Sequence, residues 1–381
     1  MPRLLHTADI HLGARHEALG AAAAALRERQ QGALRAIVDL ALTERVDALL
    51  IAGDLFDSNT ASRTTVERAA AELARLTAGG MHVVVLPGCR DAYSRSSVYR
   101  AYDLPALAGG DLLSVLTPDA PWVHLEALDA VVIGPAELSL DSTAGPLPDA
   151  AGHQLPGASW RIGMAHAAVG TEPGDIPAGA IRLSGLDYVA LGHDHVAAKG
   201  KDGGVTWAMA GAPEFLEDAA DGSGTVNLVT LGEQGQAKFV RVETRPVGTV
   251  SLRQTAVDAG SVGSQAELLD RLRATGDVNQ ILDVRLVGER PDVLELDLAA
   301  VRQELRDAFF QVRVEDESRP PLTTGPLPPP ETIAGAFIRT VEGRIRELES
   351  AGDAGTADEA AELREVLRLG RRTLSGMEVG R

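Results

Sequence analysis

The sequence has little of what secretion, membrane insertion or base stacking requires. It contains a single cysteine, Cys89, so an internal disulfide framework is excluded. Aromatic residues make up only 3% of the chain, which leaves few surfaces on which nucleic-acid bases could stack. No apolar run approaches the ~18 residues of a transmembrane helix, and the N-terminal residues lack the charged and then apolar run of a signal peptide. We therefore expect a cytoplasmic protein that does not enter a membrane.

Basic residues are also scarce, and they are unevenly spread. The formal net charge of −18 argues against a free-standing DNA-binding protein, because affinity for a duplex comes largely from neutralising phosphates. Residues 1–102 hold 12 arginines and no lysine against 11 acidic residues, whereas the other 279 residues carry 24 basic and 43 acidic groups. An anionic substrate would therefore meet the least repulsion at the N-terminal third.

The N-terminal part of the chain predicts a parallel α/β core. Apolar runs at residues 4–8, 49–52 and 82–86 indicate buried strands, and helical segments at 21–46, rich in Ala and Leu, and at 64–78 indicate the helices between them. This β-α-β-α-β order favours a parallel sheet with right-handed crossovers. After residue 110, short apolar runs predict further strands at residues 122–125, 130–133, 161–165, 188–191, 205–210 and 226–231.

Metal-ligand residue types recur where these predicted strands end. Side chains two residues apart lie on one face of an extended segment, so each Asp-x-His or His-x-His pair can hold one ion. Open α/β sheets place their chemistry at this edge. Carboxylate and imidazole groups together are suited to a pair of divalent ions. The predicted ligands are Asp9, His11, Asp54, His166, His193 and His195. Apart from His16, the remaining histidines His6, His82, His124 and His153 carry no motif, and we interpret them as structural or surface residues.

In their order and spacing these motifs resemble the calcineurin-like metallophosphoesterases. The segments 9–13 (DIHLG), 53–57 (GDLFD) and 211–214 (GAPE) are similar to the SbcD-type DNA repair exonucleases within that superfamily. The resemblance implies a β-sandwich flanked by helices. It also implies one ion held by Asp9, His11, Asp54 and His195, with Asp54 bridging to a second ion held by His166 and His193. Manganese is the family's usual metal, with zinc or iron as alternatives, and a hydroxide shared by the ions would attack the phosphodiester.

One motif departs from the family's pattern. Where the family has Gly-Asn-His-Asp, this chain has Gly88-Cys89-Arg90-Asp91. Cys89 could replace the asparagine as a ligand and favour softer ions, or it could leave the site with fewer ligands. Arg90 cannot donate a proton near neutral pH but could clamp a phosphate, and His16 is a candidate to replace the missing histidine. We assign Arg90 and Asp91 to the catalytic group.

The second half of the chain predicts additional domains. After a catalytic domain over residues 1–245, strand-like and helical segments over 246–318 indicate a small α+β domain, which caps the catalytic face in SbcD-type proteins. A proline-rich linker over 319–330 precedes a helical tail over 331–381. The apolar stripe of its first helix is covered either by the second helix or by a partner. The resemblance suggests the coiled coil of an SMC-like (SbcC-type) ATPase as that partner, and it allows a homodimer.

Three functions remain open at this point. The first is a metal-dependent DNA exonuclease or endonuclease subunit acting in repair. The second is a phosphodiesterase for small or nucleotide substrates, and the third is a weakened or inactive metal-binding subunit of an ATPase complex. The cap and the tail favour the first and the third.

Overall fold

The computed structural model describes residues 1–135, 146–148, 150, 154–216, 224–235, 237–291, 294–319, 328–351 and 354–374. They divide into two compact units. The first comprises Met1–Arg253 with Asn279–Ile281, and the second comprises Gln254–Val278 and Leu282–Arg381. The first unit continues past the predicted boundary at residue 245, and there β12 (Ala237–Pro246) pairs along its whole length with β11 (Thr225–Gln234). Most of the predicted proline-rich linker, and His153, lie outside the described residues.

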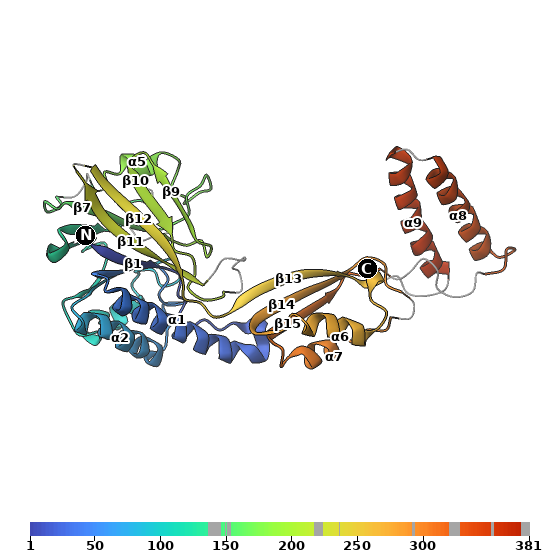
Figure 1. Cartoon of the computed structure of the whole chain (residues 1–381), viewed down its shortest axis with the longest axis horizontal. Coiled ribbons are helices and arrows are strands. Elements are labelled where there is room, and N and C mark those ends of the chain that lie inside the picture. Colours follow the sequence, from blue (N-terminus) through green and yellow to red (C-terminus); the bar gives the residue numbers. More distant parts are fainter. Residues whose placement is uncertain are drawn as a thin grey trace. The chain divides into compact units, whose positions relative to one another are not determined.

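The first sheet of the first unit contains the parallel core that the sequence predicts, and Figure 1 labels its neighbouring strands β12, β11 and β1. Its strand order is β12-β11-β1-β2-β3-β4, and its four parallel strands are β1 (Arg3–Thr7), β2 (Ala48–Ala52), β3 (His82–Leu86) and β4 (Leu113–Val115). β11 pairs with β1 in the antiparallel direction, and β12 continues the sheet beyond it.

A second six-stranded sheet has the order β5-β6-β7-β8-β10-β9. Its strands are β5 (Trp122–Leu125), β6 (Ala130–Ile133), β7 (Trp160–His166), β8 (Tyr188–Gly192), β9 (Ala198–Asp202) and β10 (Val205–Met209). The four inner strands are parallel, and the two edge strands β5 and β9 run antiparallel to their neighbours.

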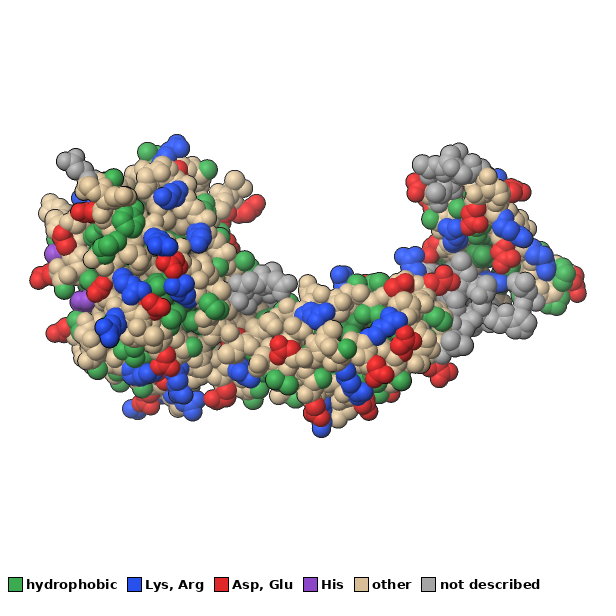
Figure 2. Space-filling view, viewed as in Figure 1, with side chains coloured by type: hydrophobic (Ala, Val, Ile, Leu, Met, Phe, Trp, Pro, Cys, Tyr) green, Lys and Arg blue, Asp and Glu red, His purple; other side chains and the backbone are tan. Residues whose placement is uncertain are grey.

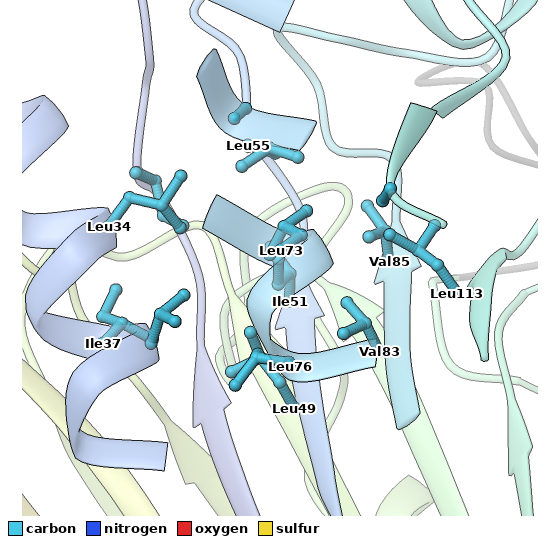
Figure 3. Close-up of a cluster of buried hydrophobic side chains, with 14 of the residues drawn as sticks. Leu34, Ile37, Leu49, Ile51, Leu55, Leu73, Leu76, Val83, Val85 and Leu113 are labelled. Atoms are coloured by element: carbon cyan, nitrogen blue, oxygen red, sulfur yellow. The ribbon is translucent and has the colours of Figure 1, made fainter. Parts of the chain in front are cut away.

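Alternating side chains of the first sheet enter two separate cores. Leu49 and Ile51 of β2 pack against α1 (Ala23–Glu44) and α2 (Arg63–Ala78), together with Leu34 of α1 and Leu73 of α2 (Figure 3). Leu50 of the same strand faces the second sheet and packs in the core that the two sheets share. Because both faces of β2 are covered, all of its residues are buried and apolar, as is typical of a central parallel strand. The fold is therefore a two-sheet α/β sandwich with helices on its outer face, as predicted.

Short helices occupy the connections of the first unit. They are α3 (Val98–Ala101), α4 (Leu104–Leu107) and α5 (Ala180–Leu183). The longer helix α2 begins where the Ser62 hydroxyl accepts a hydrogen bond from the Thr65 N–H.

The second unit begins with the α+β segment that the sequence predicts. Three strands, β13 (Ser251–Asp258), β14 (Asp277–Val287) and β15 (Phe309–Asp316), form one sheet in that order, and most of their residues belong to this unit. The helices α6 (Gln265–Arg273) and α7 (Leu298–Leu305) pack with this sheet around a core that includes Leu268, Leu282 and Val301.

The two tail helices pair with each other as a hairpin. α8 (Ile333–Ala351) and α9 (Ala354–Leu374) enclose Ile338, Ile345 and Leu367 between them. α9 therefore covers most of the apolar stripe predicted for α8, while Ile333, the first residue of α8, is 82% exposed.

The surface carries charges of both signs. Acidic and basic side chains are interspersed over the visible face of the first unit (Figure 2). Among the helices of the described ranges, none is both long enough and apolar enough to span a bilayer.

Candidate metal centre

Five strands deliver the predicted ligands to the place where the two sheets meet. Asp9, Asp54 and Cys89 follow β1, β2 and β3 of the first sheet, while His166 ends β7 and His193 follows β8 of the second sheet. Backbone hydrogen bonds hold the first two loops side by side. The Asp9 N–H donates to the Gly53 carbonyl at 3.1 Å, and the His11 N–H donates to the Asp54 carbonyl at 3.0 Å.

The backbone is strained at these positions. Asp9, His11, Asp54 and His193 adopt positive φ angles of 54°, 51°, 52° and 104°. A left-handed conformation is unfavourable for residues with a Cβ atom and persists only where the surrounding structure imposes it. Strain at four of the predicted ligands is the pattern expected of a functional site.

Two glycines allow the loops to approach one another. A Cβ atom on Gly53, whose φ is +99°, would lie 2.0 Å from His166 Nδ1, and one on Gly88 would lie 2.2 Å from Asp54 Oδ1. Either contact is far below van der Waals distance. The glycines are therefore needed for the ligand side chains to meet.

The predicted ligands meet in two groups. The ligand atoms of Asp9, His11 and His195 lie within 4.8 Å of one another, and so do those of Cys89, His166 and His193. A further group of the same size contains Asp9, Asp54 and His166 and connects the first two. All six predicted carboxylate and imidazole ligands, together with Cys89, therefore belong to one cluster.

Asp54 lies between the two groups. Its Oδ2 atom is 3.2 Å from His166 Nε2, 3.7 Å from His11 Nε2 and 3.3 Å from Cys89 Sγ. The Arg90 N–H donates to its Oδ1 atom at 2.8 Å. This is the position that the resemblance implies for a bridging carboxylate.

Two histidines present a buried nitrogen that faces the cluster. Nδ1 of His166 lies 2.9 Å from the Ala52 carbonyl and must donate to it, and Nδ1 of His11 lies 3.2 Å from Asp57 Oδ1 and donates to that carboxylate. The Nε2 atoms of both histidines are buried, and neither has a hydrogen-bond partner among the described residues. With a metal ion in place of a proton, an imidazole fixed in this way would present a lone pair from Nε2, which is how metal-ligating histidines are usually oriented. The residues present therefore fit a pair of metal ions.

The electrostatics of the cluster also favour positive charge. Burial by itself favours the neutral imidazole of His166, but Asp54, Cys89 and Asp9 outweigh it and raise the pKa of His166 well above its usual value. Burial raises the pKa of Asp9, and the neighbouring histidines oppose that shift. The carboxylates of Asp9 and Asp54 are 1% and 2% exposed, so they need either bound protons or bound cations nearby.

Asp91 differs from what we expected of a catalytic group. It is fully buried, and its oxygens accept hydrogen bonds from Gly88 N–H, Phe56 N–H and the Tyr99 hydroxyl. Burial, reinforced by the charge of Asp54, raises the pKa of Asp91 to about 6. Its contacts hold the loop that carries Cys89 and Arg90, so it is a positioning residue. Tyr99, its partner, has no motif in the sequence that indicates this role.

A pocket of about 290 Å³ opens beside the first group of ligands. Arg90 and His16 line it together with His11, His195 and Asp57. Arg90 is exposed, so its guanidinium is accessible to a substrate. Asp57 orients His11, but in the sequence it stands out only as the last residue of the segment 53–57 (GDLFD). Its position three residues after Asp54 is the sequence feature that could have indicated a place in the site.

Two ligand groups joined through Asp54 fit paired divalent ions, as in the centres used by many phosphate-ester hydrolases. The chain matches the calcineurin-like phosphoesterase family over residues 2–197, a range that contains every predicted ligand. It belongs to this family, as the motifs predicted.

More specific similarity extends over most of the chain. The DNA double-strand break repair protein Mre11 of Aeropyrum pernix is 27% identical over 292 residues, which cover 71% of this chain and 67% of that protein. The Mre11 proteins of Sulfolobus acidocaldarius and Saccharolobus solfataricus are each 26% identical. The alignments cover 79% of this chain and 79% of the first protein, and 76% of this chain and 76% of the second. The chain is thus similar to Mre11 proteins well beyond the residues that match the family.

Proposed function

We propose that this chain is a metal-dependent phosphodiesterase that cleaves DNA as the nuclease subunit of a repair complex. The observation that carries the proposal is the pair of ligand groups joined by Asp54 beside an accessible pocket. The names of the relatives support DNA as the substrate, because these relatives are DNA double-strand break repair proteins. Bound ions, manganese by our expectation, would supply Lewis-acid stabilisation and an activated water.

The chain's own residues would bind and orient the phosphodiester. Arg90 carries a permanent charge and can make paired hydrogen bonds to phosphate oxygens, so it would hold the scissile group against the ligands that share its pocket. A guanidinium does not release a proton near neutral pH. The leaving oxygen must then receive its proton from another group or from water.

The test is a manganese-supplemented nuclease assay on DNA with defined ends, combined with metal analysis. We expect two ions per chain in the wild type and the loss of most of both ions, and of cleavage, in Asp54→Ala. His124→Ala on β5, outside the centre, is the matched control. Full metal occupancy in Asp54→Ala would refute the assignment of the centre. Metal binding without any cleavage would favour an inactive subunit, and cleavage restricted to small phosphodiesters would favour the nucleotide phosphodiesterase.

Substitutions at Cys89 and Arg90 distinguish two possibilities. In the first the altered loop only weakens catalysis, and in the second Arg90 binds the scissile phosphate. If the altered loop only weakens catalysis, Cys89→Asn with Arg90→His should raise cleavage on the order of 10²-fold, the usual contribution of one proton-transfer group. If Arg90 clamps the phosphate, the same double variant should cleave more slowly. Arg90→Ala with activity equal to or above that of the wild type would exclude the clamp.

We further propose that the helical tail binds an SMC-like ATPase, which would supply the DNA affinity that an acidic chain lacks. The support is a hairpin with its own apolar core and additional exposed apolar residues, namely Val366, Leu369 and Leu374 on α9. Deletion of residues 331–381 should leave the first unit folded and metal-loaded while abolishing binding to the ATPase. A truncated protein that loses its metals would instead indicate that the hairpin stabilises its own chain.

A further inference from the structure

The two ligand groups of the centre differ in their donor atoms. Asp9, His11 and His195 offer one carboxylate and two imidazoles, whereas Cys89, His166 and His193 offer one sulfur and two imidazoles. Asp54 lies within reach of both groups. The two positions of this chain are therefore chemically unequal.

The surrounding loop holds the sulfur at the second position. The Arg90 N–H donates to Asp54 Oδ1, and the Gly88 N–H donates to Asp91 Oδ1 at 2.7 Å, so the backbone is fixed on both sides of Cys89. The Cys89 Sγ–H donates to Asp54 Oδ2 at 3.3 Å. The thiol is directed into the cluster by these contacts.

An independent feature of the same position points to a bound ligand. The side chain of His166 is only 6% exposed, and its Nδ1 atom is occupied by the Ala52 carbonyl. Its Nε2 atom faces Cys89 and Asp54 and has no hydrogen-bond partner in the part of the chain that the structure describes. A buried ring nitrogen beside a carboxylate, a thiol and a second imidazole is suited to a cation that takes the place of its proton.

The donor atoms determine which cation is preferred. Zinc binds readily to sets of thiolate, imidazole and carboxylate ligands in tetrahedral geometry, whereas manganese and magnesium prefer oxygen ligands. The second position offers one sulfur, two nitrogens and the Asp54 oxygen. The first position has no sulfur and two carboxylates within reach.

We propose that Cys89, His166 and His193 form a zinc-selective position and that the chain works with two unlike ions, zinc there and a harder ion such as manganese at Asp9, His11 and His195. This inference rests on the two-ion centre of the proposed function and assigns each position its metal. The thiolate replaces an oxygen ligand, so zinc occupancy depends on Cys89.

Cobalt(II), a spectroscopic substitute for zinc, provides the test. Apo-protein prepared with a chelator is titrated with cobalt, and thiolate-to-cobalt charge transfer is followed in the near ultraviolet. The chain has one cysteine, so such a band can come only from Cys89. We expect the charge-transfer band to develop with the first equivalent of cobalt and to disappear when zinc is added, whereas excess manganese should leave the band in place.

Variants assign the band to its position. Cys89→Ser and Cys89→Asn should lack it, and their zinc affinity should fall by about 100-fold or more, because even loss of an outer contact to a metal ligand costs about 10–100-fold. The matched control His11→Asn removes a ligand from the other position and should retain the band. Tryptophan fluorescence verifies that each variant is folded.

Several results would overturn the inference. One is a wild-type protein that binds cobalt without the charge-transfer band, and another is an unchanged zinc affinity in both Cys89 variants. Equal manganese affinity at both positions would also refute it. The readout needs no DNA, so a zinc-selective chain without nuclease activity would refute the proposed function alone. A manganese-only nuclease without the band would refute this inference alone.

Discussion

His6 is predicted to make the stability of the first unit depend on pH. It lies on β1, fully buried, with Nδ1 2.8 Å from the Tyr188 hydroxyl and Nε2 3.1 Å from the Leu191 carbonyl. The carbonyl can only accept, so Nε2 donates to it and Nδ1 accepts from Tyr188. These two contacts join β1 to β8 close to the metal centre, and the bond that Nδ1 accepts from Tyr188 requires a neutral ring.

The size of the effect follows from the pKa of this histidine. Burial lowers the pKa of His6 from 6.5 to about 3, although the hydrogen bond to Leu191 opposes the shift. Below pH 6.5 the unfolded chain binds a proton that the folded state excludes. The stability from the neutral ring is therefore complete above pH 6.5 and is lost as the pH falls towards 3. At about 1.4 kcal/mol per pH unit, lowering the pH from 7 to 5 costs about 2 kcal/mol.

The assay compares His6→Gln with the wild type. Glutamine is of similar length and does not titrate, so the variant should be less stable at pH 7 and should lose about 2 kcal/mol less than the wild type between pH 7 and pH 5. Urea unfolding followed by tryptophan fluorescence reports on the first unit, since all three tryptophans lie on β5, β7 and β10. A chelator keeps metal release out of the measurement, and His124→Gln is the control. Equal losses in the wild type and His6→Gln would refute the reasoning.

Three further substitutions test the centre. Gly53→Ala places a Cβ atom 2.0 Å from His166 Nδ1, so we expect metal analysis to find the position of that histidine empty, and full occupancy would contradict this. Asp57→Asn weakens the contact that orients His11 and should lower manganese affinity about 10–100-fold in calorimetric titration, whereas unchanged affinity would argue against an orienting role. Asp91→Asn removes a carboxyl whose pKa rises from 3.8 to about 6 on folding, so the folded wild type gains stability by binding a proton as the pH falls. The deficit of this variant in urea unfolding should therefore widen by up to about 3 kcal/mol between pH 7 and pH 4, and a constant deficit would exclude the shift.

Local pattern was sufficient for the central elements and for the ligand types. The apolar run of β2 predicted a strand covered on both faces, because only a central parallel strand excludes polar residues from both sides. The edge strand β9 (AKGKD) was missed, because an exposed strand needs no apolar residues and therefore leaves no periodic signal. The long β12 was missed as well, and its residues are only partly buried.

The sequence by itself determined which residues could bind metal ions, because parallel strands present their carboxyl ends at one edge and the ligand-type residues follow those ends. Only the tertiary structure decided how they group. The second sheet brings His166 and His193 to Cys89, and the burial of Asp91 turns an expected catalytic carboxylate into a support for the loop. The grouping of the ligands depends on contacts between residues far apart in the chain, and the packing of one sheet on the other creates those contacts.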